Sequence, residues 1–174
     1  NAGLIMPKEK HNEMLKKIID EKTKDPVKDQ ANESLKFYLI SNELSEAKII
    51  MNAIEEREGN VVSDNLSYGL RYSNEPVVMN GDPIRSLAEH YLNKMPCPGK
   101  FRSNVLVNKI TESIMQLQCN GVIWSVEKYC DPYLFEFPIF QQSMKEKGIH
   151  LLKIEAEDVS NSGRLKTKLE AFME

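Results

Sequence analysis

The sequence has no long apolar run and no excess of basic charge, and these two absences exclude several classes of protein. No stretch approaches the roughly 20 consecutive apolar residues that a transmembrane helix needs. The chain carries 23 lysines and arginines against 26 aspartates and glutamates, a net charge of −3. Nothing therefore attracts it electrostatically to nucleic acid or to an anionic membrane surface, and we expect neither among its partners.

Glycine-rich and nucleophile motifs are also missing. The 8 glycines are scattered along the chain, so no phosphate-binding loop supports a nucleotide-binding function. No serine stands in a nucleophile-elbow sequence. The 3 cysteines are an odd number without regular spacing, which argues against a disulfide framework and favours a reducing, cytoplasmic location. We therefore predict free thiols.

What is present is the composition of an ordinary globular domain, with 41% apolar and 28% charged residues. A chain of 174 residues is long enough for one domain with a sizeable core. It begins Asn1-Ala2-Gly3 rather than with methionine, which resembles the remnant of a removed expression tag. We divide it into an amino-terminal helix and linker, residues 1–34, and a single domain, residues 35–174, and expect both to belong to a longer subunit.

Short apolar runs alternate with amphipathic stretches along the chain, and they predict strands and helices respectively. Strands are expected at residues 35–41, 61–64, 122–125 and 149–154, and helices at residues 7–24, 44–58, 83–94, 104–117, 132–147 and 162–173. Residues 65–81 show no strong period and are expected to form a long loop. The alternation predicts an α/β fold, a small four-stranded parallel sheet with helices on both faces, flavodoxin-like or Rossmann-like.

We expect the strand order 2-1-3-4, which places the loops after the first and third strands at the switch point of the sheet. Ligands collect at that point in open parallel sheets. The two loops carry residues 41–43 and 127–130. Cys130 thus follows the carboxyl end of a strand, and Pro132 opens the next helix. A thiol there can be a ligand, a nucleophile or simply a small buried residue.

Four segments in series carry a more specific pattern. They contain Ser-Tyr-Gly-Leu-Arg-Tyr, Met-Pro-Cys-Pro-Gly, Cys-Asp-Pro-Tyr and Gly-Arg-Leu-Lys-Thr-Lys, within residues 66–72, 82–99, 121–133 and 163–174. In this order and spacing the chain, from about Leu35 to its end, resembles the carboxyl-terminal part of the 2-hydroxyacyl-CoA dehydratase and benzoyl-CoA reductase family, which includes the D-component of 2-hydroxyglutaryl-CoA dehydratase. It departs from the family at Lys168, usually arginine, and at Arg164, often glutamine.

The resemblance implies that Cys130 is one of three cysteines that hold an unusual iron–sulfur cluster, a [4Fe–4S] cluster, in each subunit of the family. Thiolates suit such clusters, and the other two cysteines would lie outside this chain. Cys97, between two prolines in a rigid turn, is a second candidate ligand, with packing or plain exposure as the alternative. Cys119 precedes the third predicted strand, where a small core residue is expected.

Ser67 and Arg71 are the candidate residues on the substrate side. An arginine can hold a phosphate or a carboxylate of an acyl-CoA through parallel hydrogen bonds. A surface arginine is the other interpretation of this position. Both residues fall in the predicted long loop, and loops of that length are often functional.

The resemblance further implies a lyase that removes water from a 2-hydroxyacyl-CoA by a ketyl-radical route. A separate ATP-dependent iron–sulfur activator would donate one electron, and a second dehydratase subunit would complete the enzyme. This chain alone is therefore expected to be inactive. Two alternatives stay open: a subunit of a benzoyl-CoA-type reductase, or a non-catalytic binding or regulatory relative with the same fold.

Overall fold

The computed structural model describes residues 5–24, 34–42, 44–73, 75–100 and 103–174. The chain separates into two units, Asn1–Ser34 and Leu35–Glu174. The described part of the first unit consists mainly of helix α2 (Lys8–Lys24), at the place where the sequence predicted a helix. None of the helices in the described ranges combines the length and the apolar character that crossing a membrane requires.

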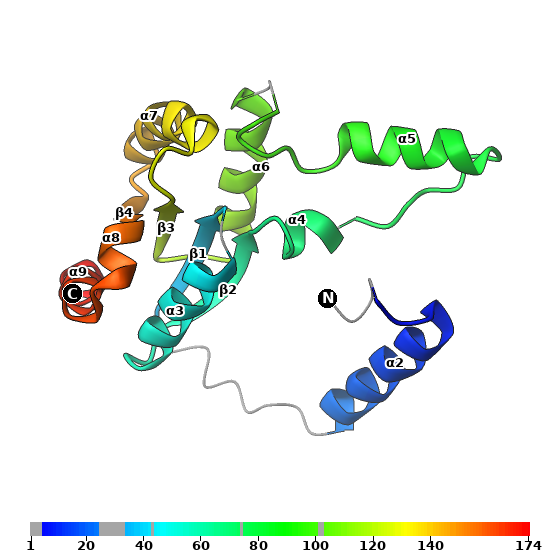
Figure 1. Cartoon of the computed structure of the whole chain (residues 1–174), viewed down its shortest axis with the longest axis horizontal. Coiled ribbons are helices and arrows are strands. Elements are labelled where there is room, and N and C mark those ends of the chain that lie inside the picture. The colour runs from blue at the N-terminus through cyan, green and yellow to red at the C-terminus, as the bar shows by residue number, and fades with distance from the viewer. Residues whose placement is uncertain (1–4, 25–33, 43, 74, 101–102) are drawn as a thin grey trace. The chain divides into compact units, whose positions relative to one another are not determined.

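The second unit is built on a four-stranded parallel sheet (Figure 1). Its strands are β1 (Lys36–Ser41), β2 (Asn60–Asn65), β3 (Gly121–Val126) and β4 (His150–Glu155). β1 pairs with both β2 and β3, and β4 pairs with β3, all in parallel. The order is β2-β1-β3-β4, so the predicted α/β class and strand order are confirmed.

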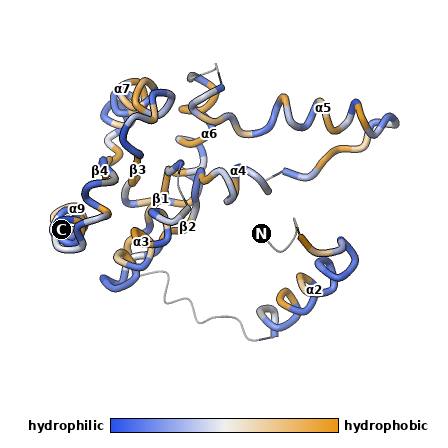
Figure 2. Tube along the Cα trace, viewed as in Figure 1, coloured by the Kyte–Doolittle hydropathy of each residue, from blue (hydrophilic) through white to orange (hydrophobic). Residues whose placement is uncertain are grey.

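Helices cover both faces of this sheet. α6 (Ser103–Gln116) and α7 (Asp131–Glu146) enclose one core, which contains Trp124. α3 (Leu44–Glu55), the short α8 (Ala156–Ser160) and α9 (Ser162–Met173) enclose the other, which contains Ile123. Successive residues of β3 thus enter opposite cores, as the pleat of a strand requires. Figure 2 shows apolar and polar residues interspersed along these helices, as expected of helices that bury one face.

The connection from β2 to β3 is the longest between two strands of the sheet. It carries α4 (Leu70–Ser73), α5 (Pro83–Asn93) and α6. α5 begins at a sharp cap, where the Asp82 side chain accepts from the Ile84 N–H at 2.9 Å. The sequence predicted α5 and α6 but treated residues 65–81 as loop throughout, so α4 is a new element, as is α8 after β4.

Candidate functional site

The loops after β1 and β3 meet at the carboxyl edge of the sheet, as the strand order requires. Asn42 Nδ2 donates to Glu127 Oε2 at 3.1 Å, and the Glu127 N–H donates to Asn42 Oδ1 at 3.3 Å. This reciprocal pair ties the two loops together at the predicted switch point. Residue 43 of the first loop lies outside the described residues.

Cys130 stands at the position from which α7 begins. Tyr129 before it has a φ of 69°, in the left-handed region that bulky residues rarely adopt. The Cys130 carbonyl oxygen accepts from the N–H groups of Tyr133 and Leu134, each at 3.1 Å. Its thiol is free and half-buried, and it packs against the core that contains Trp124. The thiol therefore lies just beyond the end of β3, on a loop of fixed shape.

Arg71 in α4 is hydrogen-bonded to three neutral side chains. Its Nη1 donates to Asn65 Oδ1 at 3.1 Å and to the Tyr133 hydroxyl at 3.0 Å, and its Nη2 donates to Ser67 Oγ. The Tyr133 hydroxyl in turn donates to the Ser41 carbonyl oxygen at 3.4 Å. Arg71 is thus half-buried and connects the end of β2 with the start of α7.

Asp64 builds the turn that brings Arg71 to this place. Its Oδ1 accepts from the N–H groups of Leu66 and Leu70, each at 3.0 Å. Gly69 passes so close to that carboxylate that a Cβ atom on it would overlap the oxygen. Only glycine fits such a close approach, and this is the physical reason for the glycine in the segment that carries Ser67 and Arg71.

Cys97 lies in the turn between α5 and α6, and its thiol is free and half-buried. A Cβ atom on Gly99 would lie 3.7 Å from Cys97 Sγ and 3.9 Å from Pro132 Cβ. The two-proline turn therefore packs close to the first turn of α7. The structure brings the second candidate thiol toward the loop that carries Cys130.

Tyr133 connects the two thiols with Arg71. Burial raises the pKa of Tyr133, and the charge and the hydrogen bond of Arg71 act against this increase. Negative charge on Cys97 or Cys130 would raise it further, because both sulfur atoms are close enough to act on the phenol. Tyr133 is therefore neutral near pH 7, and its hydroxyl can donate and accept.

Trp124, the only tryptophan of the chain, lies directly beneath this cluster. It is fully buried, and its ring centroid is 5.9 Å from that of Tyr133, 5.6 Å from that of Phe137 and 4.9 Å from that of Phe140. A change in the position of Tyr133 is therefore transmitted to a single natural fluorophore.

Cys119 differs from the other two cysteines. It precedes β3 at the opposite, amino-terminal edge of the sheet and packs against the core of α6 and α7. Burial raises the pKa of its thiol, while nearby Lys36 acts in the opposite direction. A protonated thiol that packs against the core fits the structural role that the sequence predicted for Cys119.

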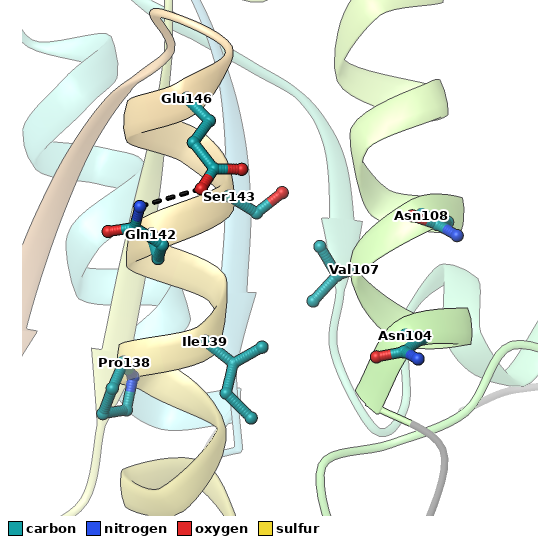
Figure 3. Close-up of a pocket in the computed structure, with 8 residues that line it drawn as sticks. All are labelled: Asn104, Val107, Asn108, Pro138, Ile139, Gln142, Ser143 and Glu146. Atoms are coloured by element: carbon teal, nitrogen blue, oxygen red, sulfur yellow. Dashed lines mark hydrogen bonds between the residues drawn. The ribbon is translucent and has the colours of Figure 1, made fainter.

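One groove on this domain has few side chains that could take part in a reaction. It lies between α6 and α7, has a volume of about 650 Å³, and is lined by side chains from both helices (Figure 3). Its lining residues are Asn104, Val107, Asn108, Pro138, Ile139, Gln142, Ser143 and Glu146. Glu146 is the ionisable member and accepts from Gln142 Nε2 at 2.8 Å, so this groove is not a candidate for the reacting centre.

The two departures from the family pattern, Arg164 and Lys168, both contact one buried carboxylate. Lys168 Nζ lies 2.6 Å from Asp158 Oδ2, and Arg164 Nε lies 2.6 Å from Oδ1. The Glu155 N–H donates to the same Oδ2 at 3.0 Å. Burial would raise the pKa of Asp158, but this N–H and the two cations outweigh it and hold that pKa below its usual value. The departures therefore form one ion-pair group that joins α8 to α9.

An iron–sulfur cluster normally takes several cysteine ligands. In the part of the chain that the structure describes, no group of three histidine, cysteine or acidic side chains could hold a metal ion by itself. Cys130 and Cys97 nevertheless fit part of such a donor set, because both are half-buried thiols close to the Tyr133 phenol.

Sequence reasoning placed Asn42 in a loop at the switch point but did not single out Asn65 or Tyr133 as site residues. Asn65 ends β2 and Asn42 follows β1, so their positions at strand ends were the available signal. Tyr133 was visible only as a neighbour of Cys130 in the Cys-Asp-Pro-Tyr segment. The role of Tyr133 became apparent only from its hydrogen bond with Arg71, which lies 62 positions earlier in the sequence.

The fold and the site together define a class of protein. The domain is a parallel α/β sandwich whose strand-end loops present thiol, guanidinium and phenol groups at the switch point, where nucleotide-binding relatives of this architecture present a glycine-rich loop. Such a domain presents side chains at the switch point.

The whole chain, residues 1–174, matches the family described as 2-hydroxyglutaryl-CoA dehydratase, D-component. The chain belongs to this family, as the four segments predicted.

Curated relatives agree with this membership. The lactoyl-CoA dehydratase subunit beta of Anaerotignum propionicum is 26% identical over 180 residues, which cover 99% of this chain and 46% of that protein. The (R)-phenyllactyl-CoA dehydratase beta subunit of Clostridium sporogenes is 23% identical, with coverage of 99% and 46%. A benzoyl-CoA reductase subunit of Thauera aromatica is 24% identical, with coverage of 94% and 42%. The chain thus spans about half the length of the curated relatives it matches.

Proposed function

We propose that this chain is part of a subunit of a 2-hydroxyacyl-CoA dehydratase. Its family and the names of two relatives, a lactoyl-CoA and a phenyllactyl-CoA dehydratase subunit, support a lyase acting on a CoA thioester. The observation that carries the proposal is the half-buried Cys130 thiol at the carboxyl edge of the sheet, on a loop of fixed shape beside the Arg71 and Tyr133 pair.

The reaction removes the hydroxyl group from C2 and a proton from C3 of the acyl chain, and leaves a 2,3-unsaturated thioester and water. The C3 proton is too weakly acidic for an ordinary base. One electron added to the thioester carbonyl gives a ketyl radical that expels hydroxide, after which the C3 proton is acidic enough to leave. The electron is then returned, so the overall reaction consumes none. A [4Fe–4S] cluster, when bound, supplies this one-electron chemistry.

Cys130 is the residue that we assign to iron, with Cys97 as a second candidate. Iron binds the thiolate form of a cysteine. The further ligands would come from outside this chain, since the described residues offer no complete set. The buried aromatic rings around Trp124 would keep water from the inner side of the site.

Partner proteins follow from the same proposal. Each of the three relatives is named as one subunit of its enzyme, which supports a second dehydratase subunit as a partner. We also assign an ATP-dependent iron–sulfur activator as electron donor and an acyl-CoA as substrate. The chain taken alone would then be inactive.

Substitution of the cysteines in the complete subunit, reconstituted without oxygen and combined with its partner subunit, tests the proposal. Cys130→Ser is expected to lower the iron content and abolish dehydration while far-UV circular dichroism stays unchanged. Cys119→Ser is the matched control, because Cys119 is also a half-buried free thiol, and it is expected to change neither quantity. Full iron and full activity in Cys130→Ser would contradict the assignment.

A benzoyl-CoA-type reductase is the second candidate, because the benzoyl-CoA reductase relative matches at about the same identity as the dehydratase relatives. The number of electrons consumed separates the two. A reductase consumes reductant in proportion to product, whereas a dehydratase needs only a catalytic amount. Reductant consumption should therefore be measured for the assembled enzyme with a 2-hydroxyacyl-CoA and with an aromatic CoA thioester.

A further inference from the structure

Arg71 has an unusual electrostatic position among the arginines that the structure describes. The others each pair with a carboxylate: Arg57 with Glu170 at 2.7 Å, Arg85 with Glu89 at 2.9 Å, and Arg164 with Asp158 at 2.6 Å. Arg71 is half-buried, and its three partners are neutral. Arg71 makes no ion pair among the described residues, although Asp64 lines the same cavity. A partly desolvated guanidinium without an ion pair favours the binding of an acceptor from outside.

Donor groups of Arg71 are still available. A guanidinium carries five N–H donors, and the bonds to Asn65, Tyr133 and Ser67 use both on Nη1 and one on Nη2. The Nε–H and one N–H on Nη2 are left to hold an external oxygen. The guanidinium is also fixed in position, because its hydrogen bonds reach β2, the β2–α4 turn and α7 at the same time.

Asn65 is held in one orientation by its bond with Arg71. It is 1% exposed, and its Oδ1 accepts from Arg71. A guanidinium only donates, so this bond fixes which way the amide is oriented. The Asn65 Nδ2 group is then buried. Burial raises the pKa of the neighbouring Tyr38, and a hydrogen bond from the Asn65 side chain acts in the opposite direction. The Tyr38 hydroxyl donates to the Asp64 carbonyl oxygen at 3.2 Å and can accept at the same time.

The charged side chains around the Cys130 loop indicate which kind of acceptor binds to Arg71. On the other side of the Cys130 loop, a cavity of about 280 Å³ is lined by Glu127, Glu155 and Glu157. The lysine there, Lys128, is paired with Glu157 at 2.7 Å. That side disfavours a phosphate chain. Arg71 reaches Tyr133 in the first turn after Cys130, and the phosphates of CoA are separated from the thioester by the whole pantetheine arm.

We propose that Arg71 donates its two remaining N–H groups to the thioester carbonyl oxygen of the bound acyl-CoA. Negative charge develops on that oxygen when the thioester is reduced, so a preorganised cation there stabilises the transition state more than the ground state. Asn65, Ser67 and Tyr133 are positioning residues that hold the guanidinium. The inference rests on the proposed dehydratase function and assigns its acyl-binding residue.

Ligand titration of the chain, followed by Trp124 emission, tests the inference without any cluster. Trp124 contacts Tyr133 at 5.9 Å between ring centroids, and Tyr133 accepts from Arg71, so a ligand on Arg71 should change the emission. The ligands are a 2-hydroxyacyl-CoA, free CoA and inorganic pyrophosphate. We expect the acyl-CoA to bind at least about tenfold more tightly than free CoA, and Arg71→Gln to remove that difference.

Two further variants complete the design. Arg57→Gln is the matched control, because it removes an arginine whose side chain is only 17% exposed and should leave the preference for acyl-CoA intact. Arg71→Lys keeps the charge but loses the planar fork, and it should reduce the preference severalfold. It replaces Arg71→Gln if circular dichroism shows that variant to be unfolded.

Three results of the titration would overturn the inference. One is that the unmodified chain binds acyl-CoA no more tightly than free CoA. The others are that Arg71→Gln weakens the binding of free CoA and pyrophosphate as much as that of acyl-CoA, or that it leaves the affinity for all three ligands unchanged. In the complete enzyme, Arg71→Gln should lower kcat while iron content stays unchanged; a loss of iron would place Arg71 at the cluster instead. Failure of the proposed function appears separately, as a complete subunit that binds no iron and dehydrates no 2-hydroxyacyl-CoA.

Discussion

Replacing Tyr133 with phenylalanine is the smallest change that tests the polar cluster. It removes one oxygen atom, which accepts from Arg71 at 3.0 Å and donates to the Ser41 carbonyl oxygen at 3.4 Å. The ring that packs on Trp124 is kept. A hydrogen bond to a charged group contributes about 1.5–3 kcal/mol. Water can replace part of the lost bond because Arg71 is half-buried, so we expect the free energy of unfolding to fall by about 1.5–2 kcal/mol.

Urea unfolding monitored by Trp124 emission measures this change. With a slope of about 2 kcal/mol/M, the midpoint should move to lower urea by roughly 0.75–1 M. Tyr129→Phe is the control, since Tyr129 is 81% exposed, and a surface substitution of this kind should stay within about 0.5 kcal/mol. If both variants shifted the midpoint equally, the bond between Arg71 and Tyr133 would contribute nothing, and the cluster would need another explanation.

Two other substitutions have defined outcomes. Asp158→Asn should lower the free energy of unfolding by about 2 kcal/mol, less than a fully buried ion pair contributes, because Arg164 and Lys168 are partly exposed. Since the folded-state pKa of Asp158 is lowered, its contribution should be present above about pH 4 and lost as the pH falls further. Thermal unfolding between pH 3 and pH 6 should show a weaker acid dependence in the variant, and an unchanged dependence would refute this. Gly69→Ala should displace the Asp64 carboxylate and unwind α4, seen as faster amide exchange at Leu66 and Leu70, whereas Gly99→Ala, which meets only ordinary contacts, should not.

The sequence predicted the sheet well because buried parallel strands are short apolar runs, and the run before Cys130 is one of them. It could not predict α4 and α8. Helices of four and five residues carry no period of their own, and here carboxylates hold them: Asp64 bonds the start of α4, and Asp158 bonds the Glu155 N–H before α8.

The site was predicted in part for a related reason. The place of Cys130 followed from the end of one strand, which is local information. The surroundings of Arg71 depend on a residue 62 positions away, and the approach of Cys97 to the Cys130 loop depends on the packing of Gly99 near Pro132. Such contacts arise from tertiary structure and leave no pattern in neighbouring residues.

The long connection from β2 to β3 has a consequence for how this domain can change. β1 is held from both sides, with Lys36 opposite Asn60 and Phe37 opposite Gly121, so residues 66–120 form a loop closed by the sheet itself (Figure 1). The entropy of closing a flexible loop grows only with the logarithm of its length, and doubling the length costs about 0.6 kcal/mol. Within this connection, the stretch of residues 75–82 has no helix or strand and can therefore gain or lose residues with little effect on folding, while the register of β1 and β3 is unchanged. The segments on either side of it are constrained, because Arg71 is held by hydrogen bonds to β2 and α7 and α6 packs in the core. Changes of length are thus tolerated between the two parts of the connection that carry the candidate residues.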